Sequence, residues 1–401
     1  MKEALSEIPE GRRTKGGNFK YLMTDFIIAV IIALIRSTNH TAEAIIRFWD
    51  LNKPFLHSLG LFINEEAKGQ IPASKTFYRL TEILDSEKFC EMFFKFITRV
   101  AIVKTKHGLK IISVDGKTMR GTSCGSSKKP LHILTAFYSM LSIPISCVSC
   151  KEKSNEITAW HQLLDLLKTQ CKGKIFTSDA MGCQIKIVEK IITYEGNYCL
   201  ALKGNQLNLE KEARDMIERN INFIEQYSEE PSVGHGRIER RVCSVYNADP
   251  SCDNAYITGL EKWAGIKRII CIKSYRTNKN TGEETVSDER MYISNLECTA
   301  EEFNTITRSH WAVEIFHYIL DVDFHQDSIK RRNDHSGHAS RNLDLFQKAA
   351  YIVLMLYDKL LSKLNRDRKL LGIKNMIYRT NASNKWITDI FTLDMTWLDA
   401  G

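Results

Sequence analysis

The sequence lacks an apolar run long enough to cross a membrane. Its longest uninterrupted apolar stretch, FIIAVIIALI at residues 26–35, has ten residues and lies between Asp25 and Arg36, whereas a spanning helix needs about 18 or more. We therefore expect a buried helix here and no membrane partner. Residues 1–20 are polar and basic, so we expect no secretory signal and a cytoplasmic protein.

The sequence also lacks the paired cysteine patterns of disulfide-rich and zinc-binding domains. Eleven cysteines, an odd number, are scattered singly through 401 residues, which is typical of free thiols in a reducing compartment. Only Cys147 and Cys150 have the C-x-x-C spacing, and no second pair follows at zinc-finger spacing. A structural role is therefore the favoured interpretation of this pair, and a zinc-binding regulator is the weaker alternative.

The composition excludes a disordered chain. Apolar residues make up 43% of the sequence and charged residues 26%, which are ordinary values for a globular protein. The net charge is +8. This mild excess permits a polyanionic partner such as nucleic acid without requiring one.

Residues 1–106 are predicted to form a helical N-terminal domain. After a polar opening, apolar residues recur at helical spacing as far as residue 104, and Thr41 is a candidate cap for the second helix. The pattern favours a compact all-α unit.

Residues 107–231 have strands alternating with helices in the order β-β-β-α-β-α-β. The first three strands are joined by tight turns and form an antiparallel meander, whereas the last two each follow a helix and so pair in parallel. This order predicts a mixed five-stranded sheet covered by helices, which is the ribonuclease H-like topology. A long charged helix is expected over residues 206–227.

Residues 232–300 return to strands and are predicted to form a β-rich insertion that interrupts the catalytic fold. Helices resume over residues 301–365, which we expect to be the second part of the core. Residues 366–401 form a tail to which we assign no role. The predicted fold class is therefore mixed α+β, with a ribonuclease H-like core, a β-rich insertion and a preceding all-α domain.

Two carboxylates follow predicted strands of the core. Asp115 ends the first strand and Asp179 ends the fourth, and because these strands are predicted to pair in parallel, both side chains should emerge at one sheet edge. Two carboxylates that close repel each other, which raises a pKa or recruits a divalent cation. Oxygen ligands of this kind suit Mg²⁺ or Mn²⁺, and two such ions support phosphodiester chemistry.

A third carboxylate is expected at such a site. Glu314 lies on the predicted helix HWAVEIFHYILD, with Asp321 on the same helix face as the competing candidate. Each acidic residue also has a structural interpretation. A strand-end Asp alone is more often a turn or cap residue, and Glu314 alone is interpretable as a surface charge. Two aspartates at matching strand ends favour the functional interpretation.

The whole chain resembles the DDE-type transposases of bacterial insertion sequences, in the group that contains the H-repeat-associated proteins. The motifs that carry the resemblance are VDGKTMRG, LHILTAF, EKSNEITA, DAMGCQ, ALKGNQ, GHGRIERR and HWAVEIFHYILDVDFHQD. By this resemblance Asp115, Asp179 and Glu314 are the catalytic acidic triad and the ligands of the metal ions.

Basic and amide side chains near these carboxylates are candidate contacts to DNA phosphates. The candidates are Lys117, Arg120, Lys203, Asn205, Gln206, His235, Arg237, Arg308 and His310. For the lysines, a solvated surface role is an equally strong interpretation. Related transposases carry Tyr, Arg and Lys at set distances around the glutamate, and this chain departs from that pattern because Thr307 precedes and Asp321 follows Glu314 by seven residues.

The resemblance implies a magnesium-dependent transposase that cleaves DNA at the ends of its mobile element and joins them to target DNA. Its partners would be double-stranded DNA and further copies of the chain, because two ends must be joined. By the resemblance and its position, the helical domain of residues 1–106 would bind the DNA ends. The alternatives are a ribonuclease H-like nuclease without strand transfer and a catalytically inactive DNA-binding derivative.

Overall fold

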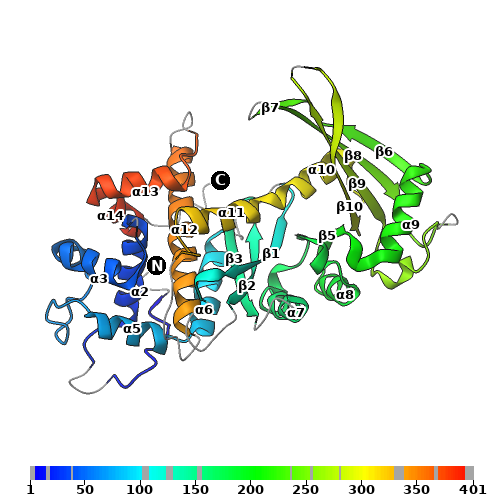
Figure 1. Ribbon diagram of the computed structural model, residues 1–401. Coiled ribbons are helices and arrows are strands. Elements are labelled where there is room, and N and C mark those ends of the chain that lie inside the picture. The colour runs from blue at the N-terminus through cyan, green and yellow to red at the C-terminus, as the bar shows by residue number, and fades with distance from the viewer. Residues whose placement is uncertain are drawn as a thin grey trace.

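The computed structural model has the N-terminal helices at one end, a sheet in the middle, and the long strands of the predicted insertion at the other end (Figure 1). The residues that it describes are 5–14, 19–37, 39–101, 108–122, 130–150, 156–234, 237–252, 256–279, 281–328, 338–364 and 369–392.

The helical N-terminal part is built around one apolar helix, α2 (Met23–Arg36). Every residue from Asp25 to Ile35 is buried, as the apolar run predicts, and none of the described helices is long and apolar enough to cross a membrane. Thr41 caps the next helix by accepting a hydrogen bond from the backbone N–H of Ala44 at 3.3 Å, which confirms the predicted cap. The surrounding helices are α3 (Ala42–Leu51), α4 (Lys53–Ser58), α5 (Ser74–Ile83) and α6 (Ser86–Ala101).

A long C-terminal helix, α12 (His338–Leu364), joins the helical part to the sheet. It packs against α2, α5 and α6 on one side and against the edge strand β3 (Ile143–Cys150) on the other. Two further helices follow, α13 (Ile373–Ala382) and α14 (Asn384–Thr392), and α13 contacts both α12 and α2. The segment to which no role is assigned from sequence therefore completes the helical core as far as residue 392.

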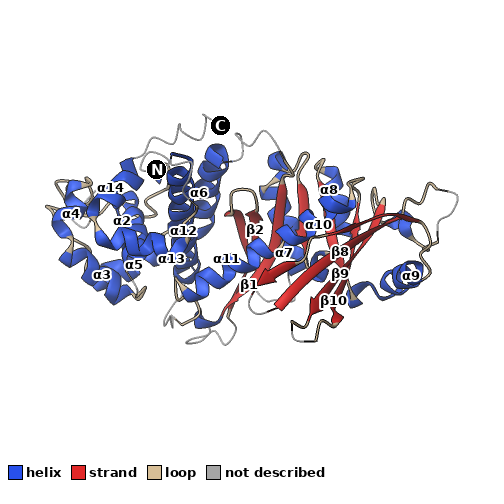
Figure 2. Cartoon of the chain, turned by 90° about the horizontal axis from the view of Figure 1, so that it is seen from above, coloured by secondary structure: helices blue, strands red, loops and turns tan. Residues whose placement is uncertain are grey.

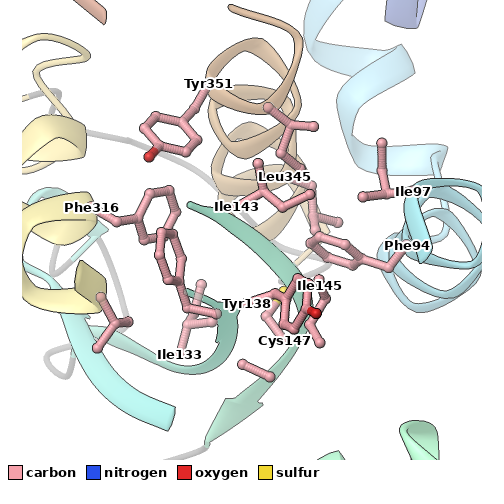
Figure 3. Close-up of a cluster of buried hydrophobic side chains, with 14 of the residues drawn as sticks. Phe94, Ile97, Ile133, Tyr138, Ile143, Ile145, Cys147, Phe316, Leu345 and Tyr351 are labelled. Carbon is pink, nitrogen blue, oxygen red and sulfur yellow. The ribbon is translucent and has the colours of Figure 1, made fainter. Parts of the chain in front are cut away.

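The core between α12 and the sheet combines aromatic and aliphatic side chains (Figure 3). Phe316 lies between two other rings, with its centroid 5.2 Å from that of Phe137 and 4.7 Å from that of Tyr351. The three rings come from a sheet strand and from two consecutive helices, and the strand is far from both helices in sequence. Their packing fixes the helix that carries Glu314 against the sheet.

The central strands are paired as the sequence predicts. Their order is β3-β2-β1-β4-β5, with β1, β2 and β3 antiparallel and with β4 parallel to both β1 and β5. The strands are β1 (Ile111–Met119), β2 (Leu131–Tyr138), β3 (Ile143–Cys150), β4 (Ile175–Ser178) and β5 (Asn197–Leu202).

Helices cover both faces of these strands. Figure 1 shows α10 (Ala300–Ser309) and α11 (Trp311–Val322) above the sheet, and α7 (Glu156–Leu166) and α8 (Ile185–Thr193) below it. Since side chains alternate along a strand, neighbouring residues of β1 face different helices. Figure 2 shows the same arrangement from above, with α11 crossing in front of β1.

The sheet is larger than predicted, because the β-rich segment does not form a separate layer. Residues Met291–Ser294 pair antiparallel with Cys199–Leu202 of β5, and the sheet continues through β10 to a total of ten strands. The free edge of β5 thus receives the hydrogen-bond partners that its backbone requires. The added strands are β6 (Phe223–Ser228), β7 (Ser232–Gly234), β8 (Arg237–Asn247), β9 (Arg268–Thr277) and β10 (Glu284–Ser294).

The prediction of one long helix over residues 206–227 is wrong. Helix α9 (Leu207–Glu218) is shorter, and residues 223–228 form strand β6. Asn220 and Asn222 both have left-handed backbone conformations, with φ of 53° and 57°, which end a right-handed helix and which Asn tolerates better than most residues. The two asparagines in the sequence RNIN were the available sign of this break.

The C-x-x-C pair does not form a two-thiol site. Cys147 and Cys150 are both buried and free, as the structural interpretation predicts. The near neighbour of Cys147 is Cys90 of α6, with the two sulfur atoms 3.6 Å apart. Burial raises the pKa of the Cys150 thiol to about 11, so this group is a protonated core side chain at neutral pH.

Candidate acidic site at the edge of two parallel strands

Asp115 lies where β1 loses its parallel neighbour. The pairing of β1 with β4 ends at Val114 and Ser178, while β1 itself continues as far as Met119 beside β2. Asp115 therefore does not end its strand as predicted, although its side chain does emerge at the edge where β4 stops. The strand continues because the antiparallel hairpin with β2 supplies hydrogen bonds beyond this point.

A histidine of α11 holds the Asp115 carboxylate. His317 Nδ1 is 3.1 Å from Asp115 Oδ2. Burial raises the pKa of Asp115, but the hydrogen bond and charge of His317, together with the charge of His310, outweigh it and leave the pKa below its ordinary value. Asp115 is therefore a carboxylate anion whose direction is set from the helix.

Asp179 caps the short turn that follows β4. Its carboxylate accepts a hydrogen bond from the backbone N–H of Met181 at 3.0 Å. Burial raises the pKa of Asp179, and the negative charges of Asp115 and Glu156 raise it further. The turn-cap role given as the structural interpretation is thus present, together with electrostatic proximity to Asp115.

Glu314 faces the same carboxylates from α11. The helix buries Val313 and Phe316 and leaves Glu314 on its exposed side. Partial burial raises the pKa of Glu314, and the charges of Asp115 and Asp179 act in the same direction. The charges of Asp115 and Asp179 therefore reach Glu314, although the three side chains come from a strand, the turn after another strand and a helix.

This arrangement fits a divalent cation in donor chemistry and charge. Asp115, Asp179 and Glu314 offer only oxygen atoms, the donors that Mg²⁺ and Mn²⁺ prefer, and a cation would relieve their mutual repulsion. Across the part of the chain that the structure describes, no three His, Cys, Asp or Glu side chains are arranged as a set of metal ligands. The three carboxylates are thus a candidate site that ligand binding would have to draw together.

The raised pKa values predict a stability effect. Asp179 binds its proton more tightly in the folded chain than in the unfolded chain, so the folded state loses stability as the pH rises through the interval between the two pKa values. In EDTA at pH 7, Asp179→Asn should therefore raise the Tm by about 1–2 °C, a small effect because the side chain is only partly buried and solvent screens its charge. At a pH well below the pKa of Asp179 in the unfolded chain, this increase in Tm should disappear.

Thermal melts of both proteins across pH check this expectation. The matched control is Asp249→Asn. Hydrogen bonds from Ser251 lower the pKa of Asp249, so this substitution should lower the Tm at pH 7 instead of raising it. A Tm of Asp179→Asn at or below that of the wild type at pH 7 would contradict the expected repulsion.

Asp321, the competing third carboxylate, is neutralised by a lysine. Lys117 Nζ lies 2.6 Å from Asp321 Oδ1 and 3.3 Å from Asp327 Oδ1. The Lys117 side chain is only 10% exposed. Lys117 is therefore used inside the protein, and it does not offer the free ammonium group that the prediction of a phosphate contact requires.

Two other residues predicted to contact DNA, Asn205 and Gln206, instead form hydrogen bonds with the turn after Asp179. The side-chain amide of Asn205 donates to the carbonyl oxygen atoms of Ala180 and Cys183, the latter at 3.2 Å. The Gln206 amide also donates to Cys183, at 3.0 Å. These amides hold the turn against β5, whereas Lys203 is exposed and remains a predicted phosphate contact.

The remaining residues predicted to contact DNA lie in different environments. Arg308 pairs with the Glu229 carboxylate, and the Arg120 backbone N–H donates to Asp327 at 3.0 Å while its side chain is largely exposed. His310 lies at the acidic site, with Nδ1 3.1 Å from Thr177 Oγ1 of β4. His235 is outside the described residues, and of Arg237 only the backbone in β8 is described.

Sequence reasoning missed three residues that lie against the site. His132 and Glu156 contact each other beside Gly116, and the charge of Arg290 on β10 lowers the pKa of Glu314 against the other influences. The motifs LHILTAF and EKSNEITA contain the first two. Nothing in their spacing showed that they would meet, because the contact depends on how α7 returns across the sheet.

The chain is similar in sequence to a known protein family and to several known proteins. A family model described as "Transposase DDE domain" matches residues 106–343. The "H repeat-associated putative transposase YhhI" of Escherichia coli (strain K12) is 34% identical over 348 residues, covering 84% of this chain and 86% of that protein. The "Putative transposase YncI" of Escherichia coli O157:H7 is 30% identical over 370 residues, covering 91% and 90%.

Among solved structures, the chain is similar to one described as "Cryo-EM structure of piggyBac transposase synaptic complex with hairpin DNA (SNHP)". That match covers 99% of this chain and 79% of the other chain, with 10% sequence identity and a TM-score of 0.42.

Proposed function

This chain belongs to the DDE transposases, and from that premise we propose that it cleaves DNA at the ends of a mobile element and joins the freed ends to target DNA. Water attacks a phosphodiester bond at an element end, and the 3′-hydroxyl group so released attacks a phosphodiester bond of the target. The observation that carries the proposal is that Asp115 and Asp179 directly follow the last paired residues of two neighbouring parallel strands. Glu314 lies on the helix whose His317 contacts Asp115.

In this proposal the three carboxylates hold two Mg²⁺ or Mn²⁺ ions. Such ions would activate the attacking oxygen and stabilise the leaving oxygen of an in-line displacement. The protein's own part is to present the carboxylates in fixed directions. His317 directs Asp115, and Asn205 and Gln206 brace the turn that follows Asp179. The five central strands are, in this view, a ribonuclease H-like core.

The proposed partner is double-stranded DNA bound by at least two copies of the chain, because two element ends have to be joined. We assign contact with the terminal repeats to the N-terminal helices and contact with the cleaved strand to the sheet edge around Asp179. The mild positive charge of the chain, +8, supports a polyanionic partner.

The experiment that tests the function uses the genomic DNA on both sides of the gene, in which the proposal expects inverted repeats. The purified protein with Mg²⁺ should release 3′-hydroxyl ends from this DNA and join pre-cleaved ends to a plasmid. Cleavage without any joined product would favour a nuclease, and DNA binding without either reaction would favour an inactive derivative.

Lys203 provides a separate test of the DNA-binding surface. It follows β5 at the same sheet edge as Asp179 and is exposed, so Lys203→Ala should weaken binding of all DNA sequences alike and reduce the slope of log K against log salt by about 1. Binding titrations at several salt concentrations measure this slope.

The matched control for Lys203 is Lys172→Ala. Lys172 is an exposed lysine near the opposite end of β4, where it pairs with Glu195. An equal change of slope in both variants would mean that Lys203 contributes only general positive charge.

A further inference from the structure

A buried polar network lies on the face of the sheet opposite Glu314. His132 of β2 and Glu156, the first residue of α7, are 2% and 5% exposed. His132 Nε2 contacts Glu156 Oε1, and His132 Nδ1 is 2.8 Å from Thr118 Oγ1 of β1. Both ring nitrogen atoms of the histidine are therefore engaged, and the network links α7 to two strands.

The network presses against the backbone next to Asp115. A Cβ atom added to Gly116 would lie 2.4 Å from Glu156 Oε1 and 2.6 Å from His132 Nε2, which are distances that real side chains do not show. Gly116 is not among the glycines with positive φ. This position therefore needs glycine for space, because the two polar side chains occupy the volume that a side chain would fill.

Alternation along β1 makes this contact relevant to the acidic site. Gly116 and Thr118 face α7, whereas Asp115 faces α11, where His317 holds it. The peptide unit between Asp115 and Gly116 is thus enclosed from both sides. The charge of Glu156 also reaches the other aspartate, since it is among the influences that raise the pKa of Asp179.

We propose that His132 and Glu156 are positioning residues, which fix the backbone at Gly116 and so hold Asp115 in the direction that binding of the metal ion requires. This inference rests on the proposed function, because it assumes that Asp115 is a metal ligand. Neither His132 nor Glu156 touches the substrate in this view. They act through Gly116, as residues that orient metal ligands without binding the metal commonly do.

The competing explanation is a purely structural one, in which the pair only anchors α7 to the sheet. Removing one member of any buried polar pair leaves the other without a partner and lowers stability. Loss of stability alone therefore does not separate the two explanations. The affinity for a divalent ion does, because a simple anchor would not change it.

The experiment measures Mn²⁺ binding to the full-length protein without DNA, by the loss of the EPR signal of free Mn²⁺, together with the Tm. Glu156→Ala and Gly116→Ala should each weaken Mn²⁺ binding about 10- to 100-fold. Glu156→Gln keeps an oxygen acceptor for His132 and should recover most of the affinity. Because both changes act on one contact, the double variant Gly116→Ala/Glu156→Ala should lose less than the two single losses combined.

The matched control is Asp344→Asn in α12. Asp344 and Lys348 form an equally buried pair, each 2% exposed and 2.7 Å apart, and they lie among the helices rather than at the acidic site. This variant should lower the Tm and leave Mn²⁺ binding within twofold of the wild type. If Glu156→Ala is insoluble, Gly116→Ala and Glu156→Gln still decide the question.

The outcomes separate this inference from the proposed function. If Asp115→Ala abolishes Mn²⁺ binding while Glu156→Ala and Gly116→Ala bind within twofold of the wild type, the positioning role is wrong and the metal site stands. If Asp115→Ala also binds within twofold of the wild type, the metal site is wrong, and the positioning role fails with it.

Discussion

Asp115→Asn is expected to reduce DNA cleavage by roughly a thousandfold or more, because the amide is a poor ligand for a divalent ion and removes one charge from the three-carboxylate site. Asp179→Asn and Glu314→Gln should have effects of the same order, since residues that act as one unit fail together. The rate of strand cleavage at an element end in Mg²⁺, measured at saturating protein, gives the comparison.

The control for these three variants is Asp249→Asn, which removes an exposed carboxylate that caps a loop at Ser251. It should cleave at the wild-type rate. DNA binding by the three variants should stay within a few-fold of the wild type. Cleavage by Glu314→Gln at the wild-type rate would mean that the third carboxylate lies elsewhere, with Asp321 the first residue to test.

Phe316→Ala is expected to lower the free energy of unfolding by about 3–5 kcal/mol, which is the usual cost of removing a buried aromatic ring. Phe316 is fully buried and its ring packs between Phe137 and Tyr351. It lies two residues from Glu314 on the same helix, so the cavity should also loosen the carboxylate and reduce cleavage. Chemical denaturation and the cleavage assay measure the two effects.

Tyr318 offers a control on the same helix. It is 64% exposed, so Tyr318→Ala should change the free energy of unfolding by no more than about 0.5 kcal/mol. A similar loss of stability in both variants would show that α11 is held by its surface rather than by the aromatic cluster.

The sequence was sufficient to predict the central strands and their order. Strand residues and the connections between them are local features, and the rule that parallel strands need a crossover helix fixed the pairing of β4 beside β1. The junction of β10 with β5 was not predictable in this way. It joins segments about 90 residues apart, and no local pattern shows that an edge strand will be extended.

The candidate site was predictable only in part, for the same reason. Asp115, Asp179 and Glu314 were chosen from strand ends, helix spacing and motifs. The charge of Asp115 raises the pKa of Asp179, and the charges of both aspartates raise the pKa of Glu314. Their catalytic role stays a prediction. The pairing of Lys117 with Asp321 was not visible in sequence. A lysine beside an acidic residue can bind a phosphate or a neighbouring carboxylate, and only the fold decides which is within reach.

Helix α12 is synthesised long after the helices against which it packs. This helix, residues 338–364, supplies core contacts to α2, α5 and α6, which the ribosome produces more than two hundred residues earlier. During synthesis α2 therefore lacks its packing partner α12 until most of the chain has emerged from the ribosome. We therefore expect the amino-terminal helices to complete their packing late, and we expect a transcript truncated before codon 338 to yield an aggregation-prone polypeptide.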